Sequence, residues 1–240
     1  LVYANKARNL RLTGRGTING NASTWEQAFW EHDYHESRRP PILVFHQCTN
    51  LLVEHLRLKD SVMWTSVYDQ CEYVTIQNLE ICSDVLENND GINLIDSSHV
   101  KVLNNKIWAD DDNICLKSNT LVGLEDILIQ GNVLYSGRAN AIKLGTDSTG
   151  PVKNVRVYDN LVLYARITGL SWESVDGSHV EGLHVRNLEI HDSGSPLFLI
   201  VGERGRGGHK PGYIRDVLIE NVYAFDTHYT LGMTIMGLPS

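Results

Sequence analysis

Two groups of aspartates have the residue type and spacing for acid–base chemistry. Asp90 lies in an Asn-Asn-Asp-Gly segment, and Asp110, Asp111 and Asp112 follow it by 20 to 22 residues. Carboxylates held close together cannot all stay ionised cheaply, so mutual repulsion raises the pKa of at least one of them. The result is a proton donor beside carboxylates that can act as bases, which is the pairing that glycoside hydrolysis requires.

Each group also has an ordinary structural explanation. Asn-Asp-Gly is a common turn, and a run of aspartates is typical of a solvated corner. For each segment considered separately, the structural explanation is stronger than the catalytic one. The distance in sequence from Asp90 to Asp111 and Asp112, however, matches a repeat that runs along the chain. We therefore expect Asp90, Asp111 and Asp112 to lie on one open face.

The repeat is a short phrase of two polar residues, an apolar residue, one intervening residue and a second apolar residue. From Leu51 onward its copies are 23, 26, 27, 28, 28 and 34 residues apart. The first apolar residues of the copies are Leu10, Leu51, Val74, Val100, Ile127, Val155, Leu183 and Val217.

This period predicts an all-β fold, a right-handed parallel β-helix (a β-solenoid). Residues 74–81 alternate apolar and polar side chains, as a half-buried strand does. We find no 3.6-residue apolar pattern sustained over three turns, and a sandwich needs turns every 8–12 residues. We predict a single β-helix domain over residues 1–240 that lacks terminal coils or caps.

Recurring asparagines and the cysteines are interpreted as parts of this architecture. The asparagines are expected at coil corners, with left-handed backbone or amide ladders. They are Asn78, Asn104, Asn105, Asn132, Asn160, Asn187 and Asn221. Cys48 and Cys71 should stack in consecutive coils without a required disulfide, and Cys82 and Cys115 should be buried thiols.

Composition limits the partners. The chain is 42% apolar and 21% charged, with a formal net charge of −8, which disfavours nucleic acid. It has no apolar run of the ~18–20 residues that a membrane helix needs. We expect no membrane partner, no cofactor and no metal, because neither a Cys-x-x-Cys pair nor a calcium-type ligand loop is present.

The aspartate segments resemble those of the polygalacturonase-type glycoside hydrolases, family 28. That family has Asn-Thr-Asp-Gly, then Gly-Asp-Asp-x-Ile-x-Ile/Leu-Lys-Ser; this chain has Asn-Asn-Asp-Gly at 88–91 and Asp-Asp-Asp-Asn-Ile-Cys-Leu-Lys-Ser at 110–118. Similarity extends from about residue 10 to about residue 225. The resemblance implies Asp90, Asp111 and Asp112 as catalytic residues, a polysaccharide substrate, a monomer, and an extracellular or periplasmic location.

Two family motifs are altered. Asn140 stands where the family has the histidine of Gly-His-Gly, and Ser171-Trp172-Glu173 stands where it has Arg-Ile-Lys. A late glycine-rich basic segment, residues 203–211, is either a substrate cradle or an ordinary surface loop. The residues that we predict to bind substrate are Asn140, Lys143, Trp172, Glu173, Arg204 and Lys210. Trp64 is interpreted mainly as a packing residue.

Three functional hypotheses follow. The leading one is an inverting hydrolase of a pectic or related polysaccharide, with Asp111 as acid and Asp90 and Asp112 as bases. The alternatives are a calcium-dependent polysaccharide lyase and a non-catalytic, glycan-binding β-helix. Because Glu173 reverses the charge of the altered motif, we expect the cleaved sugar to be neutral or to direct its acid group at Arg204, Arg206 or Lys210.

Overall fold

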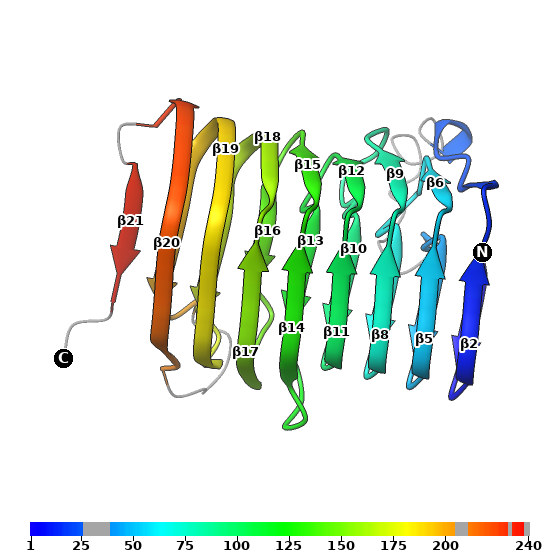
Figure 1. Ribbon diagram of the computed structural model, residues 1–240, viewed down its shortest axis with the longest axis horizontal. Coiled ribbons are helices and arrows are strands. Elements are labelled where there is room, and N and C mark those ends of the chain that lie inside the picture. Colours follow the sequence, from blue (N-terminus) through cyan, green and yellow to red (C-terminus); the bar gives the residue numbers. More distant parts are fainter. Residues whose placement is uncertain (26–38, 205–210, 230–231, 238–240) are drawn as a thin grey trace.

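The computed structural model describes residues 1–25, 39–204, 211–229 and 232–237. Its regular structure is almost entirely parallel strands, stacked coil upon coil along one long axis from the N-terminal β2 to the C-terminal β21 (Figure 1). Only residues 23–25 of the described chain are helical. None of the described helical segments has the length and apolar character needed to cross a membrane.

Three parallel sheets run along this axis. The site sheet contains β1 (Val2–Asn5), β4 (Leu43–His46), β7 (Ser66–Asp69), β10 (Ile92–Ile95), β13 (Ile114–Lys117), β16 (Asn140–Leu144), the later parts of β18 (Leu161–Ser174) and β19 (His179–Val201), and β21 (Met233–Met236). The second sheet contains β2 (Arg8–Thr13), β5 (Thr49–Glu54), β8 (Glu72–Gln77), β11 (Ser98–Leu103), β14 (Leu124–Gln130), β17 (Pro151–Tyr158), the first part of β19 and the start of β20 (Tyr213–Thr227). The third sheet contains β3 (Thr17–Asn19), β6 (Arg57–Lys59), β9 (Glu80–Ser83), β12 (Lys106–Ala109), β15 (Val133–Ser136), and parts of β18, β19 and β20.

The predicted repeat is confirmed by the strand register. Its eight apolar positions, from Leu10 to Val217, form seven successive pairs between neighbouring coils of the second sheet. Inward side chains from all three sheets form one continuous apolar core along the axis. The prediction of a parallel β-helix is therefore correct.

The recurring asparagines fall into two structural classes. At Asn78, Asn104, Asn187 and Asn221 the backbone is left-handed, with φ between 53° and 54°, as expected for corner residues. The other class is a buried amide ladder: the Asn105 Nδ2 donates to Asn132 Oδ1 at 3.0 Å, and the Asn132 Nδ2 donates to Asn160 Oδ1 at 2.9 Å.

The cysteines follow the predictions with one exception. Cys48 and Cys71 are buried, lie one coil apart and form no disulfide, and Cys115 is buried as well. The prediction for Cys82 is wrong. It is only partly buried, because β9 alternates and Cys82 is on the outward side of the strand.

We predict that the amide ladder is a main determinant of stability. Replacing Asn132 by Ala removes the acceptor of the Asn105 N–H and the donor to the Val102 carbonyl. Each buried group left without a partner costs about 1–3 kcal/mol, so the free energy of unfolding in urea should fall by about 2–4 kcal/mol. The control is Asn221→Gly, which keeps the left-handed corner and should cost less than about 1 kcal/mol. Equal losses in the two variants would contradict the prediction.

Candidate active site

A column of polar residues begins three neighbouring strands of the site sheet. The register pairs Ile92 with Ile114 and Ile114 with Ile142, so the residues two positions earlier lie side by side. These residues are Asp90, Asp112 and Asn140. Backbone hydrogen bonds join the coils here, from Gly91 N to the Asp112 carbonyl at 2.9 Å and from Asn113 N to the Asn140 carbonyl at 3.0 Å.

The local sequence fixes Asp90 closely against the next coil. A Cβ atom on Gly91 would lie 2.5 Å from the Asn113 carbonyl oxygen and 2.6 Å from the Ile107 side chain, so only glycine fits there. Asn89 is fully buried; its side chain accepts the Leu86 N–H at 2.8 Å and donates to the Ser61 carbonyl. The turn-forming residues of the segment thus hold Asp90 in place.

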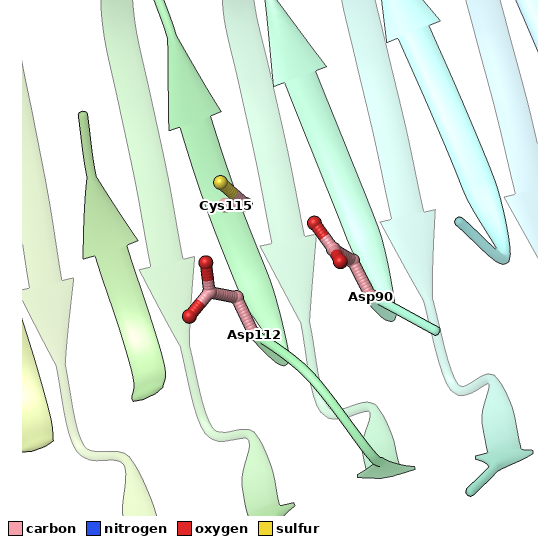
Figure 2. Close-up of side chains that lie close together, drawn as sticks. All are labelled: Asp90, Asp112 and Cys115. Atoms are coloured by element: carbon pink, nitrogen blue, oxygen red, sulfur yellow. The ribbon is translucent and has the colours of Figure 1, made fainter. Parts of the chain in front are cut away.

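Asp90 and Asp112 form a close carboxylate pair. A carboxylate oxygen of each lies within 4.8 Å of the other and of the Cys115 sulfur. Figure 2 shows both side chains at the starts of neighbouring strands, on the same side as Cys115. Burial raises the pKa of the Cys115 thiol well above its usual value, so this sulfur stays protonated.

Asp112 has the partners that a carboxylate needs. Its Oδ1 accepts the Asn140 backbone N–H at 3.1 Å and the Asn140 side-chain amide at 2.8 Å. Its Oδ2 lies 3.5 Å from the Lys143 ammonium. Burial lowers the pKa of Lys143, but the combined charges of Asp112, Glu173 and Asp111 outweigh it, so this pKa is raised.

The other two carboxyls are shifted toward the protonated form. Burial, followed by the charges of Asp112 and Asp111, raises the pKa of Asp90 well above its usual range, against the opposing charge of Lys117. Burial and then the charge of Asp112 raise the pKa of Asp111, although its Oδ1 accepts the Asp112 N–H at 2.8 Å. The third member of the run, Asp110, pairs with the Arg138 Nε at 3.1 Å.

All three predicted catalytic aspartates line one cleft of about 640 Å³. It lies on the outer face of the site sheet. Its lining comprises Met63, Trp64, Asn88, Asp90, Asp111, Asp112, Lys117, Lys143, Thr146, Asp147 and Arg204.

Two of the predicted substrate-binding residues, Trp172 and Glu173, do not line this cleft. Trp172 is fully buried, so the prediction that it binds substrate is wrong. It pairs with Leu144 and Leu199, whose side chains belong to the core, and the alternation of residues 170–173 could have revealed this. Glu173 is half-buried outside the lining and accepts the Ser171 hydroxyl at 2.7 Å. Lys210 lies outside the described residues.

The remaining predicted residues are placed at the cleft in different ways. Lys143 and Arg204 line it, whereas Asn140 is buried behind it and contacts Asp112. Arg204 is already held by Asp176, with its Nε donating to Oδ1 at 2.8 Å and a second bond to Oδ2.

Sequence reasoning undervalued two residues of the lining. Trp64, interpreted mainly as a packing residue, is only partly buried and forms part of the cleft wall. Lys117 Nζ lies 5.1 Å from the centre of the Trp64 ring. Alternation along β13 places Lys117 on the same side as Cys115, and this signal could have placed it in the site.

The model of glycosyl hydrolases family 28 matches residues 1–200 of the chain. The chain belongs to this family. The family 28 assignment agrees with curated relatives: a polygalacturonase of Persea americana is 28% identical over 205 residues, covering 80% of this chain and 42% of the relative. A probable polygalacturonase of Arabidopsis thaliana is 36% identical over 151 residues, covering 62% of this chain and 31% of the relative.

Solved structures of family 28 enzymes share the right-handed parallel β-helix. The exopolygalacturonase of Thermotoga maritima superposes with a TM-score of 0.68 at 22% identity, covering 93% of this chain and 60% of that one. The family 28 exopolygalacturonase of Yersinia enterocolitica superposes with a TM-score of 0.73 at 16% identity, covering 96% of this chain and 50% of that one. The family 28 chain described here thus spans less than two thirds of these proteins.

The raised pKa of Asp90 predicts a stability change with a definite sign. An acid whose pKa is raised by folding stabilises the protein at low pH, and this contribution is lost as the pH rises through the folded-state pKa. Asp90→Asn cannot ionise, so its Tm near neutral pH should exceed that of the wild type, with the difference shrinking toward about pH 4.

Asp159→Asn is the matched control for this measurement. Hydrogen bonds from Asn187 and then Gln130 lower the pKa of Asp159, so folding favours its ionised form. Replacing it by Asn should therefore lower the Tm near neutral pH or leave it unchanged. A Tm for Asp90→Asn below that of the wild type at neutral pH would contradict the expected pKa shift.

Proposed function

We propose that this protein hydrolyses glycosidic bonds of a pectic polysaccharide with inversion at the anomeric carbon. The observation that carries the proposal is the arrangement of three aspartates in one cleft: a close pair, Asp90 and Asp112, and a separate carboxyl, Asp111, with a raised pKa. Family membership supports the same reaction class. Because pectic polymers are cell-wall materials, the proposal includes a location outside the cytoplasm.

The roles of the three aspartates are those that the resemblance to family 28 implies. An inverting glycosidase uses one carboxyl as acid and another as base, on opposite faces of the sugar. Asp90 and Asp112 have oxygens within 4.8 Å of each other, so they act together as one unit. Asp111, whose pKa is raised, is the acid that protonates the glycosidic oxygen. The Asp90–Asp112 pair takes a proton from the water that attacks the opposite face.

Asn140 and Lys143 position the base. Two hydrogen bonds from Asn140 and the Lys143 ammonium hold Asp112 in a fixed orientation. Asparagine does not titrate, so this support stays constant across the pH range in which a histidine would change charge. The altered family motif therefore keeps a hydrogen-bond donor at the base.

The donor set at the pair does not suit calcium. Calcium takes six to eight oxygen ligands, whereas the candidate group here is two carboxylates and a protonated thiol, with the Lys143 ammonium 3.5 Å from Asp112. The Lys143 ammonium beside Asp112 would repel a metal cation bound to the pair. This chemistry favours the hydrolase over the calcium-dependent lyase.

Asp111→Asn tests the assignment of the acid. Turnover of the preferred oligosaccharide should fall by at least ~10²-fold, with KM changed little, because general acid catalysis contributes ~10²–10⁴-fold. Asp110→Asn is the matched control and should retain most activity, since Asp110 pairs with Arg138 instead of facing the substrate. Wild-type activity should survive a chelator. Unchanged turnover in Asp111→Asn, or an ultraviolet-absorbing unsaturated product lost with chelator, would contradict the proposal.

Asn140→Ala tests the positioning of the base. Hydrogen bonds to charged groups are worth ~10–100-fold in rate, and the backbone N–H remains, so kcat should fall by roughly 10-fold with KM nearly unchanged. Asn140→His should recover part of the loss and add a pH dependence in the range where histidine titrates. Wild-type kcat in Asn140→Ala, or equal effects on kcat and KM, would show that Asn140 does not act through Asp112.

A further inference from the structure

Three cations face the cleft, and two of them are already paired with carboxylates. Lys143 Nζ lies 3.5 Å from Asp112, and Arg204 is held by two bonds to Asp176. Lys117 differs from both. In the part of the chain that the structure describes, no carboxylate lies within 4.0 Å of its ammonium, whose recorded neighbour is the Trp64 ring at 5.1 Å.

The segment that stands in place of the family's Arg-Ile-Lys motif has no positively charged residue to bind an acidic group of the substrate. Ser171 and Glu173 occupy its two ends, and the Glu173 carboxylate accepts the Ser171 hydroxyl and lies outside the cleft lining. The expectation that a substrate acid group would turn toward Arg204 also meets an obstacle, because Asp176 already neutralises that guanidinium. The charge of Lys117 acts on the buried Asp90, yet among the described lining residues Lys117 is the cation with no carboxylate at ion-pair distance, so its ammonium can bind a ligand.

Building on the proposed function, we propose that Lys117 binds the carboxylate of an acidic sugar, a uronate unit of the substrate, in the cleft. Lysine presents three donors on a flexible stem, which suits a single carboxylate. The half-buried Trp64 ring is a positioning residue that keeps the ammonium over the cleft floor. On this view the chain selects acidic sugars, although the cations of the family's Arg-Ile-Lys motif are absent.

The test measures binding separately from hydrolysis. Calorimetry in the Asp111→Asn background compares a galacturonate oligosaccharide with its methyl-esterified form, which has the same ring and no charge. Lys117→Met, which keeps the stem against Trp64, should weaken binding of the acid by ~10–100-fold, as expected for a charge-assisted hydrogen bond. Its effect on the ester should be at least ~5-fold smaller. Lys117→Arg should keep part of the affinity for the acid.

Two further variants keep the test decisive. Lys101→Met removes an exposed lysine from the second sheet and should change neither affinity beyond ~2-fold. Lys117→Gln, with an unchanged Tm, replaces Lys117→Met if the latter does not fold. Equal weakening of acid and ester, or no weakening of either, would overturn the role of Lys117 and leave the proposed hydrolysis standing. Charge-dependent binding through Lys117 in a wild-type protein that cleaves no glycan would instead confirm Lys117 and reject the hydrolase.

Discussion

The register between successive coils is the constraint on which the site depends. Backbone hydrogen bonds set Ile92 against Ile114 and Ile114 against Ile142, and these pairings bring Asp90, Asp112 and Asn140 into one column. Adjacent strands in a sheet lie ~4.8 Å apart, so side chains in one column are in contact range. If one strand slipped by one residue, its side chains would all move to the opposite face of the sheet. The carboxylate would then point into the apolar core, and the core residues would point outward.

This register concentrates negative charge, and the surrounding groups offset it unequally. Asn140 and Lys143 contact Asp112, and Arg138 contacts Asp110. Burial and the charges of the neighbouring aspartates raise the pKa of Asp90. Such an arrangement disfavours the folded state relative to a neutral pocket. It also separates the roles of the three carboxyls, because each has a different set of partners although all lie in the same cleft.

Much of this could be predicted from the sequence because coil stacking is periodic. The interval of 22 residues between Asp90 and Asp112 equals the observed register between their strands, so their proximity was accessible from spacing alone. The prediction for Trp172 is wrong because it relied on the place of this residue in the altered motif and gave too little weight to the alternation that points its side chain inward. The pairing of Arg204 with Asp176 also spans one coil, 28 residues, but both residues lie in irregular segments, where no strand alternation indicates the direction of a side chain.

The central claim is that Asp111 lies on one side of the scissile bond and the Asp90–Asp112 pair on the other. Proton NMR of the first product formed from a pectic oligosaccharide tests it most directly, because the new reducing end shows its anomeric form before mutarotation. The account predicts that this form is opposite to the linkage cleaved, as direct attack by water requires. A first product with the anomeric form of the substrate linkage would contradict this account.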